Sequence, residues 1–300
     1  MFWSRSWNPD GLHCYVTGGS TGLGLELALL LVQKGAHVSI VARNQERLTA
    51  ALAQLEAARI SPHQKLHAYS FSLYTAAESS AALEAACKEH GDKSPDAVFT
   101  CAGAARPKYF VEMTEEDLRH GMDDAYWVQA WTIFVVSFLY PRSSGYMSFL
   151  GWGSYAPGKH ALRGLADTLQ SELMLYPDIK VQIYFPATML TPGFDEENKT
   201  KPKITLEEDN PKDAVTPAAA ALALFRGVQA GHTHITGSFI ASLFRASTRG
   251  VTPKHNWIVD AVLDGIAYFV APIWRSDLDR RVRATREEHR TYLQERGFFE

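Results

Sequence analysis

Tyr155 and Lys159 form the residue pair in this sequence whose types and spacing most directly suggest chemistry. They begin a segment with helical periodicity, and a separation of four residues places both side chains on one face of a helix. A free tyrosine has a pKa of about 10, and a neighbouring ammonium group lowers that pKa by favouring tyrosinate. The pair can therefore give a proton to a substrate oxygen, with Tyr155 as the acid and Lys159 as its partner.

A glycine-rich turn, TGGSTGLG at residues 17–24, lies between a short apolar run and a segment with helical periodicity. Gly18 allows a tight turn, Gly22 lets the chain approach a pyrophosphate, and Gly24 lets the helix pack closely on the strand. Strand, turn and helix in this order are the context that a dinucleotide-binding turn requires. The phosphates of the dinucleotide would then bind at the N-terminus of the helix.

The end of the second predicted strand carries Arg43, and Arg47 follows one helical turn later. An NAD site would have an acidic residue here to bind the ribose 2′-hydroxyl, whereas a cation suits the 2′-phosphate of NADP. Ser20 and Thr21 in the turn add hydroxyl donors. The sequence therefore predicts NADPH as the cofactor.

Strand-like and helical segments alternate along most of the chain, which favours an α/β fold with a doubly wound parallel sheet of the Rossmann type. We expect a single NADP-binding catalytic domain over residues 12–240. Beyond it the alternation fades, and residues 241–300 are expected to form a helical C-terminal extension. Residues 195–213 are polar, with two prolines, and we interpret them as a mobile surface segment that could act as a lid.

Taken together, these motifs resemble the short-chain dehydrogenase/reductase superfamily. The resemblance rests on TGxxxGxG, YxxxK, the CAG of residues 101–103, and PATMLT, residues 186–191, after the predicted sixth strand. More narrowly, CYVTGGSTGLGLELA, SYAPGKHALRGLADTLQSEL and TPGFDEENKTKP resemble the 3-ketodihydrosphingosine reductase family, particularly its fungal members. The narrower resemblance implies NADPH-dependent reduction of a long-chain keto-sphingoid lipid to dihydrosphingosine. It also implies sphingolipid synthesis at the cytosolic face of the endoplasmic reticulum membrane.

Carried over by position, the resemblance assigns catalytic roles to Tyr155, Lys159 and Ser143. The cofactor-binding residues that it implies are Gly18, Ser20, Thr21, Gly22, Gly24, Arg43, Arg47, Ala102, Gly103, Tyr155, Lys159 and Thr191. In the superfamily an acidic residue after the third strand holds adenine, and here Ser72 stands in its place. An asparagine that completes a proton relay is replaced by Ala125.

The serine that normally assists the tyrosine has no clear position, because only 52 residues separate Gly103 from Tyr155. In one alignment, TIFVVSF at residues 132–138 is the fifth strand and ends near Ser137. In the other, this region is a helix, and Ser143 and Ser144 are the serine pair with most of their strand missing. We favour the strand, because an interior strand cannot be lost without exposing backbone groups on both neighbours. Ser143 is the first candidate, and the alternative is that no serine is correctly placed.

Composition limits the partners. A net charge of −3 and a pI of about 6.4 give no basic excess for binding nucleic acid, and no cluster of metal ligands is apparent.

The apolar residues 257–274 contain two aspartates, so we expect them to pack on their own domain or a second subunit, or to lie in a membrane interface. The resemblance to the superfamily also implies a homo-oligomer. Two rival functions remain: a reductase of another carbonyl, such as a steroid or retinoid ketone, and a cofactor-binding protein without catalysis.

Overall fold

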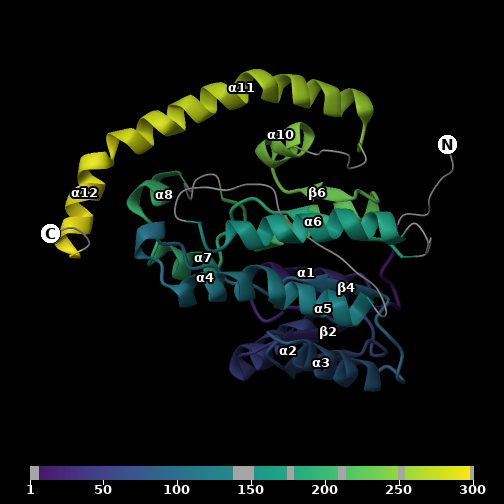
Figure 1. Cartoon of the computed structure of the whole chain (residues 1–300). Coiled ribbons are helices and arrows are strands. Elements are labelled where there is room, and N and C mark those ends of the chain that lie inside the picture. Colours follow the sequence, from purple (N-terminus) through teal and green to yellow (C-terminus); the bar gives the residue numbers. More distant parts are fainter. Residues whose placement is uncertain (1–6, 138–151, 174–178, 209–213, 249–253, 298–300) are drawn as a thin grey trace.

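A computed structural model describes residues 7–137, 152–173, 179–208, 214–248 and 254–297 (Figure 1). Its strands form two parallel sheets, one with the order β3-β2-β1-β4 and one that pairs β5 with β6. The strands are β1 (His13–Thr17), β2 (His37–Ala42), β3 (Leu66–Ser70), β4 (Ala97–Thr100), β5 (Ile183–Phe185) and β6 (His234–Thr236).

The helices alternate with the strands and continue beyond them. They are α1 (Gly22–Gln33), α2 (Gln45–Ala58), α3 (Ala76–Lys88), η1 (Phe110–Glu112), α4 (Glu115–Met122), η2 (Asp123–Trp127), α5 (Val128–Ser137), α6 (Ala156–Glu172), α7 (Pro192–Asn198), α8 (Lys203–Glu208), α9 (Pro217–Gln229), α10 (Phe239–Thr248), α11 (Trp257–Ala284) and α12 (Arg286–Glu295). The parallel sheet, its flanking helices and the helical C-terminal region confirm the predicted fold class.

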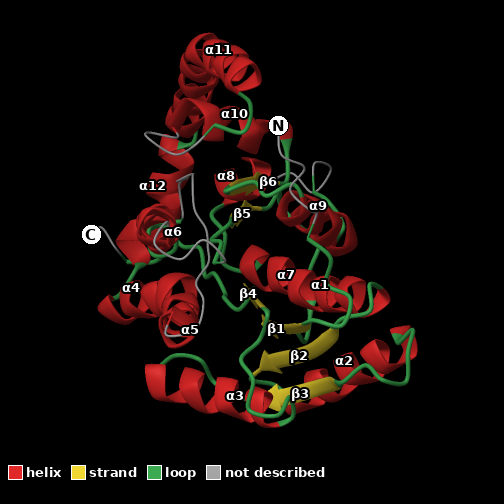
Figure 2. Ribbon diagram, turned by 90° about the vertical axis from the view of Figure 1, so that its right-hand side faces the viewer, coloured by secondary structure: helices red, strands yellow, loops and turns green. Residues whose placement is uncertain are grey.

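Helices cover the larger sheet on both faces. Every residue of β1 is buried, as expected for a short, apolar central strand between parallel neighbours. Helices α1, α2 and α9 cover one face, and α3, α5 and α6 lie on the other side (Figure 2). Leu27 and Leu31 of α1 pack with Val16 of β1 and Ile40 of β2 in the main core cluster.

Local sequence signals fix several helix starts near the site. Asn44 caps α2 by accepting a hydrogen bond from the backbone of Arg47. Thr75 and Glu78 form a capping box at α3, which satisfies backbone donors that the first turn leaves unpaired. Thr191 caps α7 by accepting from the backbone of Phe194. These caps place the loops after β2, β3 and β5 along one edge of the sheets.

The prediction that residues 132–138 form a strand is wrong, because residues 128–137 belong to helix α5. Thr132 Oγ1 donates to the backbone oxygen of Val128, one helical turn earlier. The apolar run fits either structure by composition, and tertiary packing decides between them. Val128 and Val135 pack in a cluster with residues of α3 and the sheet, so the run covers the sheet as a helix.

The segment of residues 195–213, which we interpret as a possible lid, contains regular structure in its described part, and its mobility stays a prediction. Residues 192–198 and 203–208 form α7 and α8, and Phe194, Lys201 and Ile204 are buried. Apolar and long side chains inside the charged sequence anchor the two short helices. Residues 209–213 lie outside the described residues.

Candidate active site

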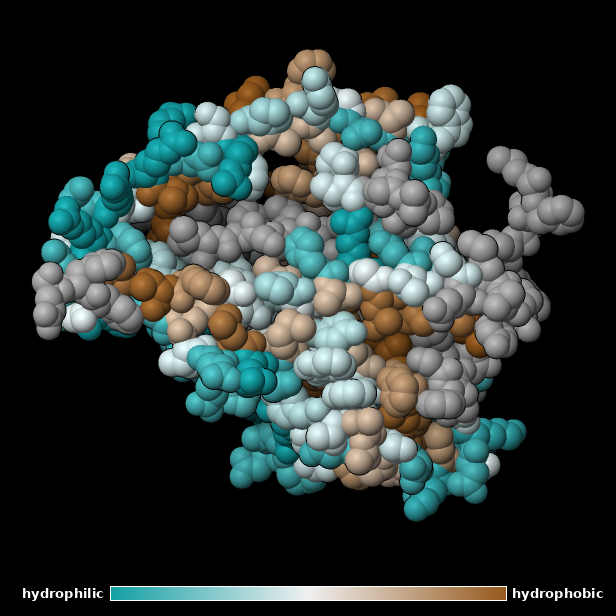
Figure 3. Space-filling view, in the orientation of Figure 1, coloured by the Kyte–Doolittle hydropathy of each residue, from teal (hydrophilic) through white to brown (hydrophobic). Residues whose placement is uncertain are grey.

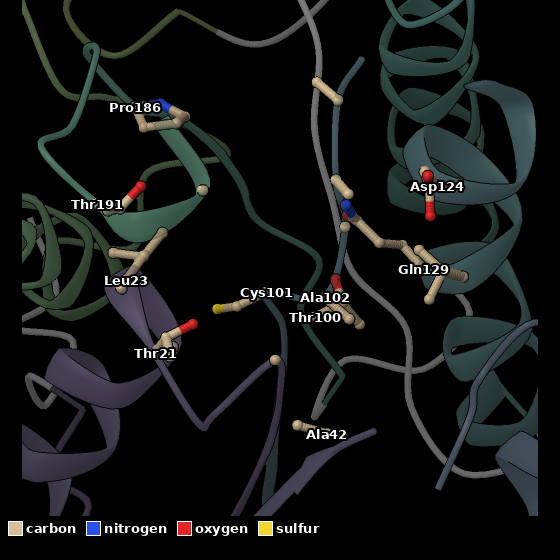
Figure 4. Close-up of a pocket in the computed structure, with 18 of the residues that line it drawn as sticks. Thr21, Leu23, Ala42, Thr100, Cys101, Ala102, Asp124, Gln129, Pro186 and Thr191 are labelled. Atoms are coloured by element: carbon tan, nitrogen blue, oxygen red, sulfur yellow. The ribbon is translucent and has the colours of Figure 1, made fainter. Parts of the chain in front are cut away.

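One cavity of about 980 Å³ lies at the carboxyl ends of the strands, where open α/β sheets bind their ligands. All twelve residues proposed to bind the cofactor line it, from the turn at Gly18 to Thr191. Figure 4 shows Thr21 and Thr191 on one side of this cavity, and Asp124 and Gln129 on the other. The structure therefore brings together residues that are far apart in the sequence, and their roles stay predictions.

The glycine turn has the backbone geometry that its sequence suggests. Gly18 has a φ of +65°, and a Cβ there would lie 2.8 Å from the backbone of Cys101 and Ala102. A Cβ at Gly24 would lie 2.3 Å from the backbone oxygen of Gly18. Only glycine fits these two positions without a shift of the backbone. The glycine-rich loop can therefore run close to the sheet, and the N-terminus of α1 faces the cavity.

Arg43 is held by a tyrosine that the sequence did not single out. Its Nη1 donates to Tyr74 Oη at 2.7 Å, and its guanidinium lies 5.2 Å from the centroid of the Tyr74 ring. Tyr74 Oη in turn donates to Asp124 Oδ1 in a short hydrogen bond. All three residues line the cavity, so this chain of contacts connects the predicted 2′-phosphate site to the helix beside Lys159.

Asp124 lies in η2, a π-helical turn between α4 and α5, and its side chain is buried. Such turns insert an extra residue into a helix and occur often at functional sites. The neighbouring Ala125 instead faces α6, 2.7 Å from where a Cβ at Gly158 would be. The cavity-lining residue of this helix is thus Asp124 rather than Ala125, which the sequence alignment had placed in the role of the asparagine.

Tyr155 precedes the first residue of α6, and Lys159 lies in the first turn of that helix. The Lys159 ammonium is 5.0 Å from the centroid of the Tyr155 ring, and burial lowers the pKa of Lys159 to about 8. Burial, with the carboxylates of Glu197 and Asp124 as smaller causes, raises the pKa of Tyr155 above its ordinary value. In the site without a bound ligand the pKa of Tyr155 is therefore raised, with burial as the largest cause.

Helix α7 closes the other side of the site. Glu196, Glu197 and Lys199 line the cavity, and Lys201 lies 3.7 Å from Glu197. The Lys201 ammonium also lies 4.3 Å from the centroid of the Phe194 ring, where a buried cation is stabilised by the aromatic face. These contacts tie the segment after Thr191 to the site.

Among the described residues, no strand lies between β4 and β5, and the cavity extends into the space between them. Val98 and Thr100 of β4 line it on one side, and Tyr184 and Phe185 of β5 line it on the other. Ser143 and Ser144 lie outside the described residues, and so does the side chain of Ser137. Ser72, in the position of the adenine-holding acid, does not line the cavity, whereas the nearby Tyr74 does.

The comparisons with known proteins point to a single family. The short chain dehydrogenase family profile matches residues 13–124. The chain is 38% identical to a 3-ketodihydrosphingosine reductase of Cryptococcus neoformans, over 99% of this chain and 93% of that protein. It is 33% identical to the Neurospora crassa enzyme of the same name, over 88% and 79% of the two chains. The chain belongs to the 3-ketodihydrosphingosine reductase family.

Solved structures agree with this assignment at the level of the fold. A short chain dehydrogenase/reductase from Burkholderia phymatum, in complex with NAD, matches with a TM-score of 0.70 and 16% identity over 82% of this chain and 95% of that one. A dehydrogenase/reductase from Sinorhizobium meliloti matches with a TM-score of 0.65 and 22% identity, over 78% and 96%. This member of the reductase family is therefore an oxidoreductase with the superfamily's fold.

The alignment with the Cryptococcus reductase is 318 positions long, more than the 300 residues of this chain. It therefore contains positions at which that reductase has a residue and this chain has none. Such gaps are expected for a chain with a short interval between Gly103 and Tyr155.

Proposed function

We propose that this protein reduces the 3-keto group of 3-ketodihydrosphingosine with NADPH, giving dihydrosphingosine for sphingolipid synthesis. The observation that carries the proposal is the shared cavity. In a chain 38% identical to a reductase of that name, Tyr155 and Lys159 line the same cavity as the glycine turn and Arg43.

The cavity residues fit a phosphorylated dinucleotide. Gly18 and Gly24 leave no room for a Cβ, so the backbone can cradle a pyrophosphate at the start of α1. Arg43 and Arg47 line the far end of the cavity and supply cations for a 2′-phosphate. Thr191 and Lys159 would hold the nicotinamide end, which supplies a hydride to the substrate when it is bound.

The proposed step consumes one hydride and one proton. Tyr155 Oη would give its proton to the carbonyl oxygen as the C=O π electrons move to that oxygen and hydride from the bound dinucleotide adds to the carbonyl carbon. The product would be the secondary alcohol. The charge of Lys159 favours the tyrosinate that remains, and solvent restores its proton. Ser143 stays the proposed residue that orients the carbonyl.

We further propose that the enzyme works at the cytosolic face of the endoplasmic reticulum membrane. An eighteen-carbon substrate partitions into lipid, so a reductase at the membrane surface meets its substrate directly. Helix α11 supports this placement, since it is long and apolar and little of it is buried in the protein. An assembly of identical subunits remains part of the proposal.

The test is a panel of carbonyl substrates in detergent, with product identified by mass spectrometry. The proposal expects dihydrosphingosine from 3-ketodihydrosphingosine and NADPH, with little turnover of steroid or retinoid ketones. Faster turnover of those ketones would support the rival substrate class. NADPH binding without turnover of any ketone would support a non-catalytic form in which no serine reaches the site.

A further inference from the structure

Helix α11 carries an apolar stripe on its solvent side. We call the outer stripe the set of Ile258, Val259, Val262, Ile266, Phe269, Val270 and Ile273. These residues recur three or four positions apart, so they share one face of the helix. Each is between 39% and 71% exposed, although apolar residues at such spacing normally face a core.

The opposite side of α11 is attached to the domain by a buried ion pair. Asp260 and Arg245 of α10 are at most 3% exposed and share two hydrogen bonds. Ala267 is also buried, and Trp274 packs edge-on against Phe244 of α10. The helix arches over the domain, and α12 returns to the body of the protein (Figure 1). Its rotation is therefore fixed, with Asp260 turned inward and the outer stripe turned outward.

Lipid fits the outer stripe better than a protein partner does. No polar side chain interrupts the stripe, whereas protein interfaces carry a polar rim and about one hydrogen bond per 100–200 Å². After Trp274 the helix becomes polar, with four arginines and two aspartates over residues 275–283, and Arg275, Arg280 and Arg281 form ion pairs with Asp277 or Asp279. In Figure 3, brown residues along the top of the molecule give way to teal toward α12. An apolar stripe followed by a polar segment with a small positive net charge matches an acyl layer bordered by lipid head groups.

The attachment to α10 decides how the helix meets the lipid. Residues 257–274 would be about 27 Å long as a helix, which is close to the thickness of a hydrocarbon core. A spanning helix, however, would be surrounded by lipid on all sides, with Asp260 removed from Arg245 and Asp264 in the hydrocarbon. Charged side chains are strongly disfavoured there. We propose that α11 lies in the plane of a membrane interface, with the outer stripe in the lipid, and does not cross the bilayer.

The first experiment measures co-flotation of the full chain with vesicles of phosphatidylcholine and phosphatidylserine. Ile266→Asp combined with Phe269→Asp places charges in the outer stripe and should weaken vesicle binding about tenfold or more. Ala53→Asp introduces the same residue at an exposed position of α2 in the catalytic domain, and should change binding less than about threefold. Equal binding by the wild type and the stripe variant would overturn the proposal.

The second experiment tests the orientation. The protein is synthesised with sealed microsomes and treated with a membrane-impermeant maleimide, with the three native cysteines as the background. A cysteine at Arg286→Cys, beyond the stripe, should react from outside to the same extent as one at Lys34→Cys on the catalytic domain. Protection of the first position until the microsomes are lysed would show a spanning helix and overturn the in-plane orientation.

Two controls separate this inference from the proposed function. Turnover of detergent-solubilised substrate should be retained in the stripe variant, which also shows that the variant folds. If the wild type does not float with vesicles and instead forms dimers through α11, a second copy covers the stripe and the proposal is wrong. Loss of NADPH turnover in every variant and in the wild type would contradict the proposed reaction and leave vesicle binding as a separate readout.

Discussion

Replacing Arg43 by alanine tests the part of the site that decides between NADPH and NADH. Arg43 is exposed at the cavity, yet its position is fixed, because Tyr74 Oη accepts from its Nη1 at 2.7 Å. Tyr74 is fixed in turn by its hydrogen bond to the buried Asp124. A guanidinium oriented in advance loses little side-chain entropy when a phosphate binds to it.

A hydrogen bond to a charged group contributes about 1.5–3 kcal/mol. Removal of the Arg43 side chain should therefore weaken NADPH binding roughly 10- to 150-fold, since about 1.4 kcal/mol corresponds to a factor of ten. NADH lacks the 2′-phosphate, so its binding should change less than about twofold. Tyr74→Phe keeps the cation and removes its anchor, so we expect a smaller loss of about two- to tenfold for NADPH.

The assay is a fluorescence titration of each protein with NADPH and with NADH. Arg119→Ala is the matched control, because this exposed arginine of α4 pairs with Glu115 and lies outside the cavity. In the double variant Arg43→Ala/Tyr74→Phe, the second change should have no further effect on the ratio of the two affinities. Retention of the NADPH preference by Arg43→Ala would refute the assignment of the 2′-phosphate site.

Three further predictions concern pH and packing. Since burial lowers the pKa of Lys159 to about 8 and catalysis needs its ammonium form, kcat/KM for the reduction should fall about tenfold per pH unit above that value; a flat profile from pH 7 to 10 would contradict this role. Burial and neighbouring histidines lower the pKa of His13 from 6.5 to about 3, so between these values the unfolded state binds the extra proton and stability falls as the pH falls. The lowered His13 pKa should reduce the free energy of unfolding by about 2 kcal/mol at pH 5 compared with neutral pH. In urea unfolding at several pH values, His13→Gln should therefore show a weaker dependence of stability on pH. Gly24→Ala should destabilise the protein by about 1–3 kcal/mol, because its Cβ would meet the backbone oxygen of Gly18, whereas Gly164→Ala, with open space around it, should not lower the melting temperature.

The parts of the site that depend on local chemistry could be predicted from the sequence. Gly18 and Gly24 stand where only glycine fits, and the four-residue spacing of Tyr155 and Lys159 fixes their shared face on one helix. Parallel strands carry these local motifs to one edge of the sheet. For that reason, all twelve residues that the sequence predicts to bind the cofactor line one cavity.

The parts that depend on tertiary packing could not be predicted. By composition, the apolar residues 132–137 could form either a strand or a helix. In the structure they form part of helix α5, which packs beside α3. Asp124 faces the cavity because a π-helical turn rotates it there, and no spacing rule reveals such a turn. Tyr74 reaches Arg43 and Asp124 across 31 and 50 residues of sequence. Its position after the third strand was the one signal that could have identified it.

His234 is a buried residue that the sequence did not single out. It lies in β6, and its Nε2 is 2.8 Å from Asp167 Oδ1. His232 stacks on His255 with 4.1 Å between the ring centroids. The alternation of polar and apolar residues over three positions is too short to distinguish a strand from a turn.

The measurement that tests the central claim most directly compares the wild type with Tyr155→Phe. Each protein is titrated with NADPH and then mixed with 3-ketodihydrosphingosine in detergent, and the loss of NADPH absorbance is followed. Our account predicts that the wild type binds NADPH and turns over, whereas Tyr155→Phe binds NADPH with nearly the same affinity and loses turnover. Turnover by Tyr155→Phe at a rate close to that of the wild type would contradict the claim that Tyr155 delivers the proton.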